Sequence, residues 1–115
     1  QAAVQELARG WKEDPDTLIW LKHRAQNDNH EDVRQAAVQE LARGWKEDPD
    51  TLTILKHRAQ NDEHWTVRRA AVQELARGWK EDPDTLTILK HRAQNDEHWT
   101  VRQAAVQELK GFELF

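Results

Sequence analysis

Residues 35–68 read QAAVQELARGWKEDPDTLTILKHRAQNDEHWTVR, and this segment decides the fold because the chain repeats it. Residues 69–102 differ from it only by Arg69 in place of Gln35, and residues 1–34 align with it without gaps. A fixed period of about 20 to 50 residues is typical of solenoids, in which each repeat is one small unit of secondary structure. We therefore predict a solenoid with a 34-residue period.

The copies differ at few positions. Residues 103–109 begin a fourth copy, and the tail from Lys110 to Phe115 leaves the pattern and is typical of a divergent cap. Residues 1–34 differ from residues 35–68 by Ile19 for Thr53, Trp20 for Ile54, Asn29 for Glu63, Glu31 for Trp65 and Asp32 for Thr66. Such identity indicates recent duplication or deliberate design. The chain has no Met and begins inside a helical pattern, so we expect a piece of a longer sequence or a start that was removed.

Composition favours an elongated stack and excludes several classes of function. Only 37% of the residues are hydrophobic and 33% are charged, which is lean for a spherical core but suits repeats that bury only their shared faces. The net charge of −4 argues against nucleic acid as a partner. The absence of Cys excludes disulfides and thiolate metal sites. Apolar stretches are short, so we expect no membrane span, no signal peptide and a cytoplasmic location.

The first helix of each copy has clear ends. Asp48 is the expected N-cap, Pro49 suits the first helical position, and Asp50 lies favourably at the positive end of the helix dipole. Asn61 is the expected left-handed terminator, so the helix is predicted to span about residues 49–60.

The second helix of each copy follows after a short turn. Asp62 is its expected N-cap, and in the first copy Asp28 with Glu31 forms a D-x-x-E capping pattern. The apolar residues Val67, Ala71 and Leu75 recur at helical spacing.

Gly and Trp mark the expected end of that helix. Gly44 and Gly78 are predicted to be C′ residues with positive φ, and Trp45 and Trp79 then stand at C″. Short turns make consecutive helices antiparallel neighbours. The prediction is an all-α fold: an alpha-solenoid of stacked antiparallel helix pairs, with about seven helices in a single domain over residues 1–115.

The run Val-Arg-x-Ala-Ala-Val-x-x-Leu at residues 67–75, after a Pro-headed helix and Asn61-Asp62, resembles a HEAT repeat. The amino-acid sequence of the whole repeat is similar to that of HEAT-like arrays in bacterial, notably cyanobacterial, NACHT-type signalling ATPases. The resemblance implies a ladder of hydrogen-bonded Arg and Asp side chains between neighbouring repeats. Its Arg members are Arg34, Arg68 and Arg102, and its acid candidates are Asp28, Asp62 and Asp96.

Five of the six Trp residues fall into two sets. Trp11, Trp45 and Trp79 occupy one repeat position and are interpreted as structural plugs between helices. Trp65 and Trp99 occupy a position that holds Glu31 in the first copy. Since a position that accepts Glu is rarely core, we expect Trp65 and Trp99 to be exposed.

Helical spacing extends this exposed aromatic pair into a candidate surface. Positions 65, 69 and 73 lie on one face of the second helix, away from its apolar stripe. The resemblance to HEAT arrays implies that second helices line the concave side, where such proteins bind partners, and Trp and Arg are enriched in interface hot spots. The predicted protein- or peptide-binding residues are Trp65, Arg69, Gln73, Trp99, Gln103 and Gln107.

Other functions have less support in the sequence. His residues on neighbouring repeats are too far apart to share a zinc ion; only His57 and His64, with Asp62 or Glu63, could converge. No nucleophile with a base and no phosphate loop is present, so we expect neither an enzyme nor a cofactor. The favoured hypothesis is a protein-binding scaffold. The alternative is a designed or recently amplified array without a ligand, and a metal-binding or enzymatic HEAT-like domain is a more distant alternative.

The ends carry a separate prediction. Gln1 begins a second-type helix that lacks its first-type partner, so an apolar stacking face should be exposed there. We expect end-to-end association through that face, with Phe112, Leu114 and Phe115 sealing the other end.

Overall fold

The computed structural model describes residues 2–112, and these residues form seven α-helices and no strand. The helices are α1 (Ala2–Gly10), α2 (Pro15–Asn27), α3 (Glu31–Gly44), α4 (Pro49–Asn61), α5 (Trp65–Gly78), α6 (Pro83–Asn95) and α7 (Trp99–Lys110). The all-α solenoid predicted from the repeat period is confirmed.

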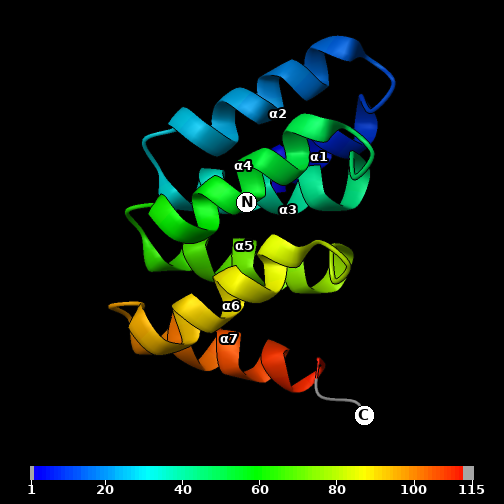
Figure 1. Ribbon diagram of the computed structural model, residues 1–115. Coiled ribbons are helices and arrows are strands. Elements are labelled where there is room, and N and C mark those ends of the chain that lie inside the picture. Colours follow the sequence, from blue (N-terminus) through cyan, green and yellow to red (C-terminus); the bar gives the residue numbers. More distant parts are fainter. Residues whose placement is uncertain (1, 113–115) are drawn as a thin grey trace.

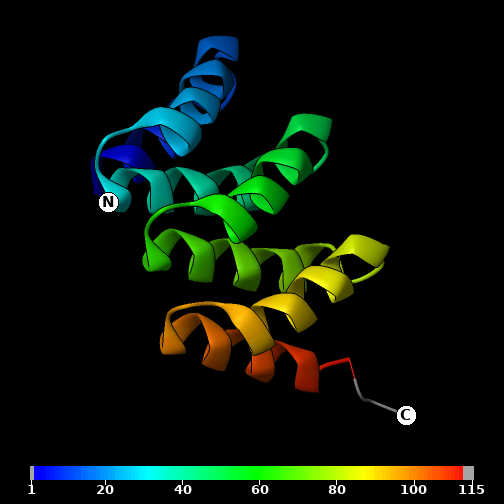
Figure 2. The same cartoon turned by 60° about the vertical axis from the view of Figure 1, so that its left-hand side comes forward.

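The helices form two layers (Figures 1 and 2). Helices α2, α4 and α6 make one layer, and α1, α3, α5 and α7 make the other. In the second layer, α5 packs against α3 and α7 far more closely than neighbours within the first layer pack against each other. A stack that is tight on one side and open on the other curves toward the tight side, so α3, α5 and α7 lie on the concave side of the array.

The predicted start of the first-layer helices is confirmed. The carboxylates of Asp14, Asp48 and Asp82 each accept a hydrogen bond of 2.9 Å from the backbone N–H two residues later. Pro follows each Asp at the first helical position, where its missing N–H costs nothing.

The predicted ends of these helices are wrong in detail. Asn61 is the last residue of α4, and no residue in the range 2–112 has a positive φ. The Asn61 side chain instead donates a hydrogen bond to the carbonyl oxygen of His57. Asp62 is the C-cap of α4, and its N–H bonds the carbonyl oxygen of Arg58. A left-handed residue is unnecessary because the chain leaves the helix in an extended conformation at Asp62.

The N-caps of the second-layer helices also differ from the prediction. His30, His64 and His98, rather than the Asp residues two positions earlier, stand at this position. Asp62 still contributes, because its carboxylate accepts the His64 N–H at 2.9 Å. Asp28 does the same for His30, so the predicted Asp28–Glu31 capping box does not form. The Asp side chain fixes the turn, and the helix begins after it.

The predicted C′ glycines are wrong as well. Gly44 and Gly78 are the last helical residues, and Trp45 and Trp79 are the C-caps. The Trp45 N–H bonds the Leu41 carbonyl oxygen at 2.9 Å. A Cβ at Gly44 would meet only the Lys12 side chain, at 3.7 Å. The chain therefore turns without left-handed backbone, and the glycine leaves space over which Lys12 lies.

One continuous apolar core runs between the layers. It contains the repeated Leu and Val positions, with Leu21, Leu55 and Leu89 from the first layer and Val67, Leu75 and Val101 from the second. Ala37 and Ala71 are fully buried as well, and their small side chains permit the close helix approach of the second layer. The core thus extends along the stack.

Polar contacts between repeats follow the same period. Lys22 of α2 pairs with Asp48 and Asp50 at the start of α4, at 3.1 and 3.0 Å. Lys56 of α4 pairs in the same way with Asp82 and Asp84 of α6. These half-exposed pairs fix the register of the first layer and contribute little energy each.

Candidate partner-binding surface

Helices α5 and α7 each begin after a His whose side chain is held by the helix itself. The Nδ1 atom of His64 accepts a hydrogen bond from the Thr66 N–H at 3.2 Å, and His98 does the same for Thr100 at 3.1 Å. An accepting Nδ1 places the ring proton on Nε2. Each imidazole is thereby fixed beside the Trp that follows it in the sequence.

Trp65 is covered by its neighbours. The ring of His98, from the next repeat, stacks on Trp65 with a centroid distance of 4.3 Å and an interplanar angle of 10°. The guanidinium of Arg69, one turn along α5, lies 5.4 Å from the Trp65 ring centroid. Trp65 is therefore half-buried and packs against the core, and the prediction that it is exposed is wrong. The spacing of 65 and 69 indicated the Arg contact, whereas the His contact comes from the adjacent repeat and was missed.

Trp99 occupies the same repeat position in different surroundings. Its side chain is 62% exposed, as predicted. Its own N-cap, His98, lies 6.3 Å away, and one helical turn along it has Gln103 where Trp65 has Arg69. Trp99 is thus the open aromatic group of the set.

Four of the six predicted binding residues line one shallow groove between α5 and α7, whereas Trp65 and Trp99 lie outside its lining. Arg69 and Gln73 of α5 face Gln103 and Gln107 of α7 across a volume of about 200 Å³, with Thr100 at its edge. Gln103 and Gln107 are exposed. We call the six residues Trp65, Arg69, Gln73, Trp99, Gln103 and Gln107 the Trp/Gln surface. It offers an open aromatic ring, a cation shielded by contact with Trp65, and amide groups that both donate and accept hydrogen bonds.

The other Trp set is built into the packing at two of its three positions. Trp45 and Trp79 are half-buried against the core, and the Nζ atoms of Lys12 and Lys46 lie 5.6 and 5.5 Å from their ring centroids. Trp11 is 61% exposed. At the other end, Phe112 takes the Trp place, with Lys80 at 5.6 Å. Leu114 and Phe115, predicted to seal that end, lie outside the described residues.

The Arg–Asp ladder implied by the resemblance is present. Arg34 donates to both oxygens of the Asp62 carboxylate, at 3.1 and 3.0 Å, and Arg68 binds Asp96 in the same way at 2.9 and 3.1 Å. All four side chains are nearly fully buried. Arg58 and Arg92 add a second guanidinium to each acid. Each rung fixes two neighbouring repeats in one relative position.

The electrostatics of the rung favour the charged pair. Burial alone would raise the pKa of the Asp96 carboxyl. Hydrogen bonds from Arg68 and the His98 N–H, with the charges of Arg68 and Arg92, outweigh burial and lower this pKa below its ordinary value of 3.8. The hydrogen bond to Asp62 likewise raises the pKa of Arg34.

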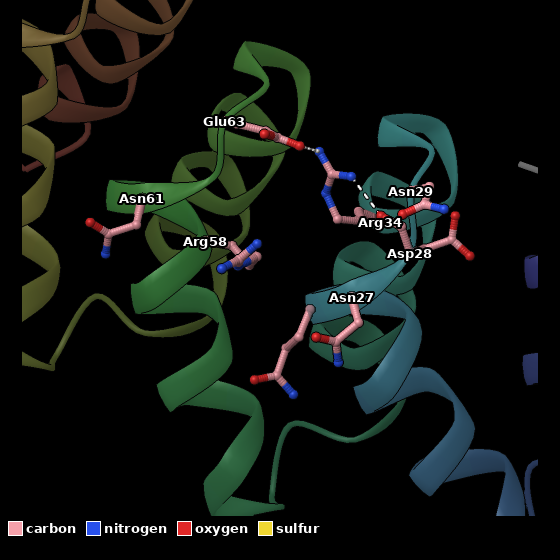
Figure 3. A pocket seen from close by; sticks show the side chains of 8 residues that line it. Asn27, Asp28, Asn29, Arg34, Arg58, Asn61 and Glu63 are labelled. Carbon is pink, nitrogen blue, oxygen red and sulfur yellow. Dashed lines mark hydrogen bonds and ion pairs between the residues drawn. The ribbon is translucent and has the colours of Figure 1, made fainter.

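A polar pocket lies over each rung and was not expected from the sequence; the pocket at Arg34 has a volume of about 370 Å³. Figure 3 shows Arg34 between Asp28 and Glu63, with Asn27, Asn29 and Asn61 around the rim. A second pocket of about 410 Å³ repeats this lining one unit along. The guanidinium group of Arg34 in the first pocket is already bonded to Asp62, and that of Arg68 in the second is bonded to Asp96. We therefore interpret both pockets as a consequence of the Arg–Asp ladder.

The two His residues that were candidates for a metal site, His57 and His64, make contacts with neighbouring residues. His57 Nδ1 lies 2.8 Å from an Arg58 guanidinium nitrogen, and His64 Nδ1 faces Thr66. Within residues 2–112 no three His, Asp or Glu side chains are arranged to hold a metal ion. In the same range no helix has the length and apolar character needed to cross a bilayer.

Comparison with known proteins identifies the repeat. A family model of HEAT repeats matches residues 20–110, which is most of the chain. No curated protein and no solved structure gives a significant match. The period, the two-layer stack and the Arg–Asp ladder agree with the family match. The chain belongs to the HEAT repeat family.

Proposed function

We propose that the chain is a non-catalytic scaffold that binds a protein partner through the Trp/Gln surface. The observation that carries the proposal is the groove between α5 and α7, which Gln73, Gln103 and Gln107 line together with Thr100. The residue before Thr100 is Trp99, which is 62% exposed. Large exposed aromatic side chains near a groove are typical of protein interfaces, in which Trp, Tyr and Arg supply most of the binding energy.

The position of this surface supports the proposal. It lies on the tightly packed layer, where backbone positions are fixed by α3, α5 and α7 packing against one another. A preorganised surface loses little conformational entropy on binding. The Gln amides suit hydrogen bonding to a peptide backbone because each can both donate and accept.

The setting we propose is the sensor segment of a larger signalling protein in the cytoplasm. This proposal is supported by the similarity of the repeat sequence to that of arrays in NACHT-type ATPases. The acidic net charge of −4 disfavours nucleic acid as a partner.

The test is a pull-down from a lysate of the source organism with the original chain and a Trp65→Glu, Trp99→Glu variant. Glu31 shows that the fold accepts Glu at this position, and circular dichroism checks that the variant is helical. A protein captured by the original and lost by the folded variant supports the proposal. Capture of the same set by both, or of nothing by either, contradicts it and favours a ligand-free array.

A second candidate is end-to-end self-association. Ala2 and Ala3 are exposed, whereas their counterparts Ala36 and Ala37 are buried. Beside them, Leu7, Trp11, Thr17 and Trp20 line a mainly apolar groove of about 310 Å³. Light scattering over a concentration series tests this candidate. Ala3→Arg should shift any assembly toward monomer, and a strictly monomeric original chain at millimolar concentration contradicts self-association.

A further inference from the structure

The two polar pockets over the Arg–Asp rungs each lie between two repeats that are both described. The first, around Arg34 (Figure 3), lies between the first and second repeats, and the second, around Arg68, lies between the second and third. Because both walls of each pocket are present, neither pocket owes its shape to an end of the array. Neither pocket shares a residue with the Trp/Gln surface.

The hydrogen-bond donors that line the second pocket are already engaged. Arg68 uses all three guanidinium nitrogens, two on the Asp96 carboxylate and one on the Asp62 carbonyl oxygen. Arg92 uses both terminal nitrogens, one on Asp96 and one beside the His91 ring, and its Nε atom is buried. An anion in this pocket would therefore compete with bonds that the guanidinium groups already make.

The hydrogen-bond acceptors of the same pocket are available. The side-chain amide nitrogens of Asn61 and Asn95 each donate to a carbonyl oxygen of their own helix at 3.2 Å, and that of Gln60 does so at 3.1 Å. Each amide oxygen is then left as an acceptor, and no group in residues 2–112 donates to it. The carboxylates of Glu63 and Glu97 are exposed beside them. The second pocket thus offers oxygen acceptors to a ligand.

The two pockets differ by one negative charge. Two guanidinium groups line each pocket, and a buried Asp of the ladder pairs with both of them. In the first pocket the exposed carboxylate is that of Glu63, and Asn29 stands at the matching place of the preceding repeat. In the second pocket both places hold Glu, as Glu63 and Glu97. The chain therefore contains the same pocket with one and with two exposed carboxylates.

The chemistry of the second pocket selects a cation that has several N–H donors. A divalent metal ion needs about six or more oxygen ligands within about 2.6 Å, and no three His, Asp or Glu side chains of residues 2–112 are arranged to hold one. A primary ammonium group has three donors that point in different directions and no acceptor. It can therefore bond to oxygens spread around a pocket, without the planar match that a guanidinium requires.

We propose that the second pocket binds a primary ammonium group, of the kind that lysine side chains and polyamines carry, and that the first pocket binds it more weakly. The ammonium group donates to the amide oxygens of Asn61 and Asn95 and lies beside the carboxylates of Glu63 and Glu97. This site goes beyond the proposed function, because it uses other residues and does not require the Trp/Gln surface.

The test is an NMR titration of the full chain with n-butylammonium chloride at constant ionic strength. The side-chain amide signals of Asn27 and Asn95 report the first and the second pocket separately. We expect both signals to shift to saturation, with half-saturation at Asn95 at an about two- to fivefold lower concentration, which is the effect of one added exposed ion pair. Butyramide, which has a similar length and no charge, should shift neither signal.

The repeats supply matched variants. Glu97→Asn gives the second pocket the lining of the first, and it should weaken binding at Asn95 by about two- to fivefold. Asn29→Glu makes the opposite change and should strengthen binding at Asn27 by a similar factor. Both residues already occur at this exposed repeat position, so the fold accepts them, and circular dichroism checks it.

Two exposed carboxylates outside the pockets control for general attraction of cations to an acidic chain. Glu47 and Glu81 are exposed and line neither pocket, so their backbone amide signals should not saturate. Acetyl-lysine methylamide and putrescine then distinguish the source of the ammonium group. Tighter binding of the lysine derivative assigns the site to a protein partner, tighter binding of putrescine assigns it to a polyamine, and both orders agree with the inference.

Three results would overturn the inference: shifts at Glu81 that match those at Asn95, equal effects of butylammonium and butyramide, or binding that Glu97→Asn leaves unchanged. The outcome is separable from that of the proposed function, because the Trp65→Glu, Trp99→Glu variant keeps both pockets. That variant should bind butylammonium as the original chain does, whether or not it has lost a partner protein.

Discussion

Arg68 and Arg102 stand at the same place in adjacent repeats, yet they have different partners. Arg68 donates to both oxygens of Asp96 and is nearly fully buried. Among residues 2–112, Arg102 donates a side-chain hydrogen bond to the backbone carbonyl oxygen of Asp96 but to no carboxylate, and it is half-buried. The difference teaches that the next repeat, rather than the repeat's own residues, completes each unit, as expected of a stack with nearest-neighbour contacts.

The largest difference in unfolding free energy between the interior of the array and its end is expected when Arg68→Ala is compared with Arg102→Ala. Arg68→Ala leaves the buried Asp96 carboxylate with Arg92 and the His98 N–H, and breaking a buried pair typically costs about 3–5 kcal/mol. Arg102→Ala removes no carboxylate contact within the described part of the chain and should cost below about 1 kcal/mol. Urea unfolding followed by circular dichroism measures both. Equal losses would show that the rung does not distinguish interior from end.

Acid should weaken the same rung while Arg68 stays in place. The pKa of Asp96 is lower in the folded chain than its ordinary value of 3.8. The stability it contributes is therefore fully present above the unfolded pKa of about 4 and is lost as the pH falls through the lower folded value. Unfolding free energies measured from pH 5 downward should decrease in the original chain. A Asp96→Asn variant should show a shallower decrease, and parallel curves would contradict the account.

Val72→Ala and Val106→Ala compare one core position inside the array and at its end. Val72 is fully buried, whereas Val106 is 44% exposed. Val72→Ala removes two buried carbon atoms and leaves a cavity, at a cost of about 2 kcal/mol. Val106→Ala should cost below about 1 kcal/mol. The helix propensities change equally in both variants, so the difference in unfolding free energy reports burial by the next repeat.

A smaller difference is expected between Asp48→Ala and Asp14→Ala. Both remove an N-cap that accepts a backbone N–H, at about 1 kcal/mol. Only Asp48 also pairs with a Lys of the preceding repeat, Lys22, at 3.1 Å, which adds about 0.5 kcal/mol. Thermal melts of the two variants should therefore differ by a few degrees, with Asp48→Ala lower. Coincident melts would assign no energy to this inter-repeat pair.

Periodicity and helix-start chemistry were sufficient to predict the helices. The Asp-Pro pair places the start of α4 at Pro49, and the apolar stripe of Val67, Ala71 and Leu75 places the buried face of α5. The ends were less predictable. Gly44 is typical of a left-handed C′ residue, but the backbone at Trp45 turns with a φ of −134°. A glycine in sequence does not reveal whether it provides conformational freedom or space for a neighbour such as Lys12.

The geometry of the candidate surface could be predicted only in part. Helical spacing correctly placed Trp65, Arg69 and Gln73 together. The cover over Trp65 comes from His98, a residue 33 positions away in the chain, and it depends on how one repeat is rotated against the next. That rotation is set by the buried Arg68–Asp96 rung, and the period alone does not specify it.

The most direct test of the central claim, that a protein partner binds the concave second layer, is site-specific photo-crosslinking. A benzoyl-phenylalanine is placed at Gln107, on the Trp/Gln surface, or at Thr53, which is exposed on the first layer. The account predicts a discrete crosslinked protein from position 107 that is absent at position 53 and is lost when Trp99→Glu is added. Crosslinks of equal yield at both positions, or crosslinks at 107 that persist with Trp99→Glu, would contradict it.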